Sequence, residues 1–228
     1  MSTTASSTQE KNILGIALAY MLALLIAWSG AWLLADWLQS QTTWLSQPLP
    51  MFLYWLILRV VLWVLPSLHI IRLSGQSVRE VLGFHRVRAI LLWGGIIGLI
   101  WGGKTPVFML LSGQPLQPFV LDLTFVTAVL YAPLVEELTF RGAILNALKT
   151  RMSFAFANFI TGCLFLVIHF PSWYFEGIFQ GDWMIPASYC LGILLLGWIL
   201  GYVANRSKSV AAATLTHMLN NLFQRFMA

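Results

Sequence analysis

The chain has 228 residues, of which 59% are hydrophobic and only 9% are charged, and its formal net charge is +5. Soluble globular domains carry about 25% charged residues, so this composition excludes an ordinary soluble domain and predicts an integral membrane protein. A net positive charge can indicate nucleic-acid binding. Here the basic residues lie at the ends of apolar runs, where membrane topology explains them. We therefore expect membrane lipid, and not nucleic acid, as a partner.

Apolar runs long enough to cross a bilayer recur along the whole chain. A helix needs about 20 residues for one crossing, and the runs predict an all-α, polytopic transmembrane bundle of about seven spans. We expect a disordered polar tail over residues 1–12 and a single membrane domain over residues 13–228. The predicted spans are 13–38, 51–71, 89–111, 120–148, 154–170, 186–204 and 210–226. A short surface helix is expected over 77–88, and a re-entrant piece is possible after the fifth span.

The basic residues separate the loops by their side of the membrane. Lys and Arg residues cluster in 72–88, 149–151 and 206–208, whereas the loop 172–185 has acidic residues and no basic one. Cytoplasmic loops carry an excess of Lys and Arg. The pattern therefore predicts a cell-membrane protein with a cytoplasmic N-terminus and a C-terminus on the other side.

Two features of the early spans bear on packing. Gly94, Gly98 and Gly102 recur at every fourth position, a small-residue pattern that lets two transmembrane helices approach closely. Arg59 lies near the middle of the second span, where a charged side chain costs at least about 2.5–3.5 kcal/mol and therefore faces the protein interior. We expect Arg59 to pair with an acid such as Asp122; the alternative is a direct role beside the acidic residues of the fourth span.

The fourth span carries Glu136, Glu137 and Arg141 within apolar sequence. Glu137 and Arg141 are four residues apart with the acid first, which is the favoured arrangement for an ion pair on one helix face. Glu136 lies about 100° further around the helix and lacks that partner. We predict that Glu137 and Arg141 hold the site together and that Glu136 is available for chemistry. Pro133, one turn earlier, can kink the helix and open space beside the acids.

The later spans also carry polar side chains. His169 ends the fifth span, while His217 and Asn221 share one face of the seventh. Taken singly, a His or Asn in a span is more often a helix-to-helix hydrogen bond than a catalyst. Together with Glu136, they would bring a carboxylate, two imidazoles and an amide from three spans into one bundle. That combination indicates a functional site.

These residues form three motifs, which are Glu136-Glu137-x-x-x-Arg141, Phe165-x-x-x-His169 and His217-x-x-x-Asn221. In this order they resemble the signature motifs of the CAAX protease and bacteriocin-processing (CPBP) family. Its members are intramembrane glutamic endopeptidases related to the Ras-converting CAAX prenyl protease. The resemblance covers roughly residues 120–226, which would be the catalytic core; the first three spans match only in general character.

The resemblance implies a protease that cleaves a peptide or protein substrate. The implied roles are water activation by Glu136 and His169, oxyanion stabilisation by His217 and Asn221, and support of the site by Glu137 and Arg141. The short chain resembles bacterial members of the family, which implies a membrane-associated or exported peptide as substrate. It gives no reason to assume prenylation.

Other functions would also bury such groups. Two His and one Glu with an open position form a known catalytic zinc set, but the sequence has no His-Glu-x-x-His pair. We therefore expect a mechanism without metal or other cofactor, with a zinc metalloprotease as the alternative. A non-catalytic peptide-binding or immunity protein would not need the complete set of residues. A transporter would usually bring an internal repeat, which is not evident here. The sequence assigns no oligomeric state.

Overall fold

The structure is a computed structural model. It describes the backbone of residues 2–226 and the side chains of residues 12–226. Every regular element in this part of the chain is a helix. Six helical stretches within it are long and apolar enough to cross a membrane: Asn12–Gln41, Pro48–Leu73, Val78–Leu111, Leu123–Leu148, Phe154–Phe175 and Met184–Ser207. The predicted all-α, polytopic bundle is therefore confirmed.

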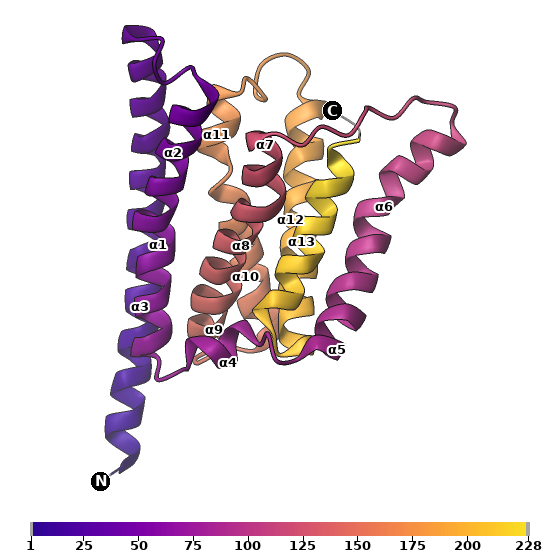
Figure 1. Cartoon of the computed structure of the whole chain (residues 1–228). Helices are drawn as coiled ribbons and strands as arrows, with labels where there is room; N and C mark the ends of the chain where they lie inside the picture. The colour runs from indigo at the N-terminus through magenta and orange to yellow at the C-terminus, as the bar shows by residue number, and fades with distance from the viewer. Residues whose placement is uncertain (1, 227–228) are drawn as a thin grey trace.

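The long helices stand side by side, while the short helices α4 and α5 lie across one end of the bundle (Figure 1). They are α1 (Ser2–Gln41), α2 (Pro48–Arg59), α3 (Leu65–Leu73), α4 (Val78–Leu82), α5 (Val87–Ala89), α6 (Ile96–Leu111), α7 (Leu123–Phe125), α8 (Ala132–Glu137), α9 (Leu145–Leu148), α10 (Phe154–Val167), α11 (Phe170–Phe175), α12 (Met184–Ser207) and α13 (Val210–Gln224). Four π-helical stretches continue the spans between α-helical parts, at Val60–Val64, Ile90–Gly95, Val126–Tyr131 and Leu138–Ile144.

The first and last helices differ in extent from the segments predicted at the two ends of the chain. The last predicted span, 210–226, is α13, which has 15 residues. At 1.5 Å per residue it is about 22 Å long, less than the roughly 30 Å of a bilayer core. At the other end, α1 continues as helix from Ser2, through the segment predicted to be a tail. The division into a disordered tail, 1–12, and one membrane domain, 13–228, stays a prediction.

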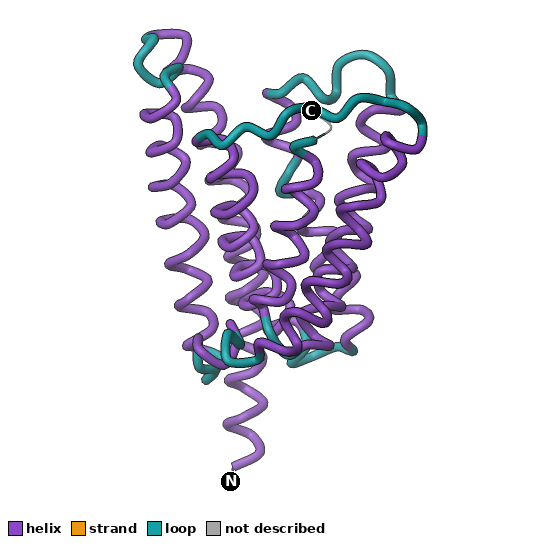
Figure 2. The backbone as a smooth tube through the Cα atoms, turned by 45° about the vertical axis from the view of Figure 1, so that its right-hand side comes forward, coloured by secondary structure: helices purple, strands orange, loops and turns teal. Residues whose placement is uncertain are grey.

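The loops fall into two groups at opposite ends of the bundle (Figures 1 and 2). The N-terminus projects from the end that holds α4, α5 and the turns after α9 and α12, whereas α13 leads to the opposite end. The three predicted basic loops therefore share one end, which we call the basic end. Their cytoplasmic location stays a prediction.

Prolines explain two of the π-helical stretches. Pro66 and Pro133 are each the second residue after such a stretch, Val60–Val64 and Val126–Tyr131. A proline has no N–H to donate, and its ring clashes with the carbonyl four residues earlier. A wider turn before the proline accommodates that clash, so the helix can continue. The helix distortion expected at Pro133 takes this form, just ahead of Glu136.

The predicted glycine face packs against α13. A methyl group at Gly94 would lie 2.5 Å from the carbonyl oxygen of Ala212, and the hydroxyl of Thr216 donates to the Gly94 carbonyl at 3.0 Å. The corresponding distance from Gly102 to the Leu219 carbonyl is 2.9 Å. Close helix packing at these glycines is confirmed, and it fixes the position of the helix that carries His217.

Gly98→Ala is expected to lower the free energy of unfolding by about 1–3 kcal/mol, the usual cost of overpacking. Its methyl group would lie 2.7 Å from Leu219 Cδ1 and 3.0 Å from Thr216 Cα. Gly103→Ala, in the same helix, is the matched control because its methyl group would lie 3.9 Å from the nearest atom of a neighbouring helix, Phe223 Cζ. Thermal unfolding in detergent measures both variants, and equal stability would contradict the packing account.

Candidate active site

One cavity brings together the four residues predicted to be catalytic. It has a volume of about 450 Å³, and its lining includes Glu136, His169, His217 and Asn221. A second cavity of about 120 Å³ is also lined by Glu136 and His169. Glu136 and His169 thus lie where the two spaces meet, although they come from α8 and from the turn between α10 and α11.

Glu137 is the centre of a buried polar cluster. Its Oε1 accepts a hydrogen bond from Arg141 Nη1 at 3.0 Å and another from His217 Nδ1 at 2.9 Å. The Glu137 and Arg141 side chains are 0% exposed. Arg141 Nη2 also donates to the carbonyl of Gly197 at 2.7 Å. The ion pair predicted from the spacing of Glu137 and Arg141 is present, and it ties the fourth span to α12 and α13.

The contact with Glu137 determines how His217 faces the cavity. A carboxylate can only accept hydrogen bonds, so His217 Nδ1 carries a proton and donates it to Glu137. Nε2 is then the ring atom left for a ligand. A neutral ring offers a lone pair at Nε2, and a ring with both protons offers a donor there. The second form is the one that the predicted oxyanion role requires.

His169 is oriented by the backbone of its own motif. Its Nδ1 lies 2.7 Å from the carbonyl oxygen of Phe165, an acceptor, so Nδ1 holds the proton and Nε2 is left as a base. The Phe165 ring is fully buried. Its centroid lies 4.9 Å from the His169 ring and 5.8 Å from the His217 ring, and the Arg141 guanidinium lies 4.5 Å from it. Phe165 therefore packs the two imidazoles and the arginine together.

The Glu136 side chain is half-buried and lines both cavities. It makes no hydrogen bond or ion pair with another residue of the described chain, in contrast to Glu137. The expectation that the arginine pairs with Glu137 and leaves Glu136 unpaired agrees with these contacts. The catalytic role of Glu136 stays a prediction.

Arg59 differs from its prediction. Asp122 pairs with Arg225 at 3.2 Å, so the expected Arg59–Asp122 pair is wrong. Arg59 instead lines both cavities beside Glu136, with its guanidinium 5.5 Å from the centre of the Trp28 ring. The rule that an intramembrane arginine faces a cavity could have identified it as a site residue.

Both polar atoms of the Asn221 side-chain amide make hydrogen bonds. Its Nδ2 donates to the carbonyl of Ala128 at 2.8 Å, and its Oδ1 accepts from Asn220 Nδ2 at 2.9 Å. An amide nitrogen has two protons, so one proton of Asn221 is left for another acceptor. Asn220 also lines the cavity and was not predicted as a site residue.

The side chains that could bind a metal bear on the zinc alternative. Within the described residues, no group of three His, Cys, Asp or Glu side chains could hold a metal ion. A catalytic zinc ion would need three such ligands and an open position. Whether the reaction uses no cofactor, as expected, or zinc, as in the alternative, stays a prediction.

Known proteins resemble the later part of this chain. Residues 118–223, which contain all three motifs, match the family described as Type II CAAX prenyl endopeptidase Rce1-like. This part of the chain is similar to CAAX prenyl proteases. The CAAX prenyl protease 2 of Methanococcus maripaludis is 27% identical over 147 residues, which are 61% of this chain and 53% of the relative. The chain thus spans about half the length of the curated relative it matches. No solved structure matches it significantly.

The matched segment, 118–223, coincides with the helices that carry the polar cluster. It runs from just before α7 to the last turn of α13 and includes Glu137, Phe165 and His217. Arg59 lies outside this segment, although it lines the same cavity. The site is therefore completed by a helix that precedes the matched segment.

Proposed function

We propose that this chain is an intramembrane endopeptidase that hydrolyses a peptide bond in a membrane-associated or exported peptide. The observation that carries the proposal is the single cavity lined by Glu136, His169, His217 and Asn221. The similarity of residues 118–223 to the CAAX prenyl endopeptidase family supports it. The two His residues, the amide and the unpaired carboxylate are the groups that peptide hydrolysis needs.

Water activation is assigned to Glu136 and His169. Peptide hydrolysis needs a base that takes a proton from the attacking water and an acid that gives one to the leaving amine. Glu136 makes no hydrogen bond or ion pair with a described arginine, so its lone pairs are available to the water. His169 holds its proton on Nδ1, which leaves Nε2 to accept a proton and return it to the amine.

Oxyanion stabilisation is assigned to His217 and Asn221. The developing oxyanion needs donors that are already in position. Asn221 supplies the amide proton that does not bond to Ala128. His217 supplies Nε2–H when its ring carries both protons, and the carboxylate of Glu137 stabilises that charged ring. In this account Glu137 and Arg141 position His217 and do not touch the substrate.

We also propose the side of the membrane from which the substrate enters the cavity. The cavity extends to Gln224 and Arg225, at the end of the bundle opposite the basic end. If the basic end is cytoplasmic, the site opens toward the outer face. This supports an exported or outward-facing peptide as the substrate.

Cysteine labelling tests that orientation. In a chain with Cys163 and Cys190 replaced by serine, Gln224→Cys is expected to react with a membrane-impermeant maleimide in intact cells. Ser77→Cys, at the basic end, is the matched control and is expected to react only after the membrane is opened. The reverse pattern would place the cavity mouth in the cytoplasm.

Chelation tests the assignment of a metal-free reaction. Activity in liposomes is expected to persist after exhaustive treatment with a zinc chelator, because the proposed base and oxyanion donors are side chains of this chain. Metal content is measured in the same samples. Loss of activity that added zinc restores would replace this mechanism with a zinc mechanism.

Reconstitution tests the proposed activity itself. The purified protein is placed in liposomes with membrane proteins from cells that lack it, and new peptide termini are identified by mass spectrometry. Glu136→Gln protein is the control. New termini that require Glu136 would support an endopeptidase, whereas identical termini in the two samples would favour a protein that binds peptides without cleaving them.

A further inference from the structure

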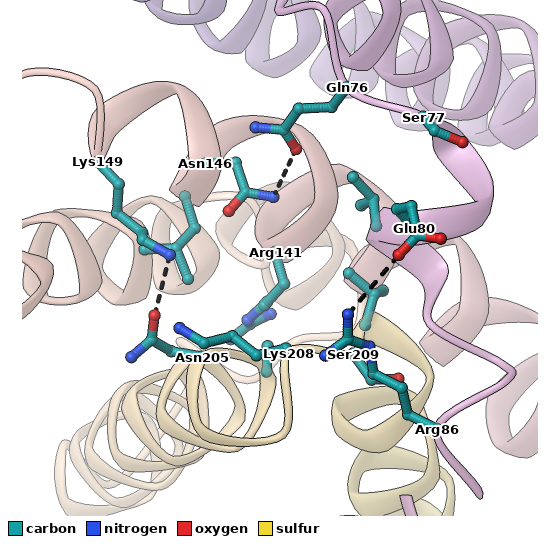
Figure 3. A pocket seen from close by; sticks show the side chains of 14 residues that line it. Gln76, Ser77, Glu80, Arg86, Arg141, Asn146, Lys149, Asn205, Lys208 and Ser209 are labelled. Carbon is teal, nitrogen blue, oxygen red and sulfur yellow. Dashed lines mark hydrogen bonds and ion pairs between the residues drawn. The ribbon is translucent and has the colours of Figure 1, made fainter. Parts of the chain in front are cut away.

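A separate cavity lies at the basic end of the bundle (Figure 3). It has a volume of about 320 Å³ and is lined by parts of α4, the π-helical stretch Leu138–Ile144, α9 and the turn from α12 to α13. Neither Glu136 nor His169 lines it. Its charged lining residues are Glu80, Arg86, Arg141, Lys149 and Lys208. Four of the five are cations, so the cavity is strongly basic.

The existing ion pairs leave two of these cations without a counter-ion. Arg86 lies 3.6 Å from Glu80, and Arg141 pairs with Glu137 behind the cavity. Lys149 Nζ donates to the neutral amide of Asn205 at 2.9 Å (Figure 3). Among the described residues, no carboxylate lies within ion-pair distance of Lys149 or of Lys208. Two ammonium groups therefore border the cavity with no anion between them.

The two lysines repel each other. Burial of the half-buried ammonium group lowers the pKa of Lys149, and the charge of the nearby Lys208 lowers it further. Both effects disfavour the charged form of Lys149. A bound anion would offset both, because it would replace lost water contacts and attract both ammonium groups.

The inner wall of the cavity also favours an anion. Arg141 is 1% exposed, and its Nε has no hydrogen-bond partner among the described residues. The first residue of α13, Val210, lines the cavity as well. The N-terminus of a helix carries a partial positive charge and free N–H groups, which attract anions. Arg141, the two lysines and the N-terminus of α13 thus line the same cavity.

The position of the cavity relates it to the membrane surface. Lys149 and Lys208 each follow directly after a membrane-spanning stretch that ends at Leu148 or Ser207. Lysines at such positions lie at the level of the lipid headgroups. Phosphate is the anionic group present there in quantity, and lysine is a common phosphate binder.

We propose that this cavity is a binding site for a phosphate group, held by Lys149 and Lys208 above the buried Arg141. The phosphate would belong either to the headgroup of an anionic phospholipid or to a soluble phosphate compound. The site is separate from the peptidase cavity, and its occupation does not depend on peptide hydrolysis.

Binding is tested with full-length protein in detergent micelles at low ionic strength. One arm adds phosphatidylglycerol, with phosphatidylcholine as the zwitterionic comparison; the other adds inorganic phosphate, with chloride at equal ionic strength. Native mass spectrometry counts retained lipid, and thermal unfolding gives the apparent affinity. The test variant is Lys149→Gln/Lys208→Gln. The matched control, Arg72→Gln/Arg88→Gln, removes two exposed cations from the same end that do not line the cavity.

The double lysine variant is expected to bind about thirtyfold more weakly than the wild type, since the two basic residues near an anionic surface contribute about 1 kcal/mol each. The arginine control is expected to bind like the wild type. A lysine-dependent effect of phosphatidylglycerol alone identifies a lipid headgroup, and one of inorganic phosphate identifies a soluble phosphate. If neither ligand binds the wild type more tightly than the lysine variant, the proposal is wrong. Unfolding without ligand confirms that each variant is folded.

Discussion

Glu136→Gln is expected to lower the rate of peptide hydrolysis by about a hundredfold to ten-thousandfold, the usual contribution of a general base. Glutamine has nearly the same shape as glutamate but cannot take a proton from water. The side chain makes no ion pair with a described residue, so thermal stability should remain close to that of the wild type. The rate is measured in liposomes with a substrate identified by its new termini.

Glu176→Gln is the control for this experiment. Glu176 lines the smaller cavity together with Glu136 and His169, so its replacement removes a carboxylate from the same surroundings. Its activity is expected to stay within a few-fold of the wild-type rate. A Glu136→Gln protein that is folded, inserted and fully active would remove Glu136 from the mechanism.

Glu137→Leu is expected to destabilise the protein by about 3–5 kcal/mol, the cost of leaving a buried charge without its partner. Arg141 would lose the carboxylate at 3.0 Å while remaining inside the bundle, and His217 would lose the acceptor of its Nδ1 proton. Thermal unfolding in detergent measures the change. Activity should be lost as well, because His217 would no longer be held in one orientation.

The double variant Glu137→Leu/Arg141→Met separates the buried charge from other effects. Replacing both members of a buried ion pair by apolar residues is often close to neutral. The double variant is therefore expected to recover most of the stability lost by Glu137→Leu, but none of the activity. A double variant as unstable as the single one would mean that the cost does not come from the uncompensated arginine.

Local spacing predicted much of the fold and part of the site. The long apolar runs determine the transmembrane helices, and the basic loops do lie together at one end. The Glu137–Arg141 pair follows from a separation of one helical turn, and close packing at Gly98 follows from the repeat of small residues. These features depend on residues close together in the sequence, so a helical period is enough to derive them.

Contacts between distant spans could not be derived in this way. The hydrogen bond from His217 to Glu137 joins residues 80 positions apart, and it depends on how α13 is rotated and how deep it lies. The expected pairing of Arg59 with Asp122 failed for the same reason, because a rotation of one helix changes which charge it meets. Spacing along a single helix carries no information about that rotation.

The most direct measurement of the central claim compares peptide termini in the membranes of native cells that carry the wild type or Glu136→Gln at equal abundance. The account predicts at least one pair of new termini, from one cleaved peptide bond, that is present only with the wild type. Identical sets of termini, with the variant folded and inserted, would contradict an endopeptidase that uses Glu136.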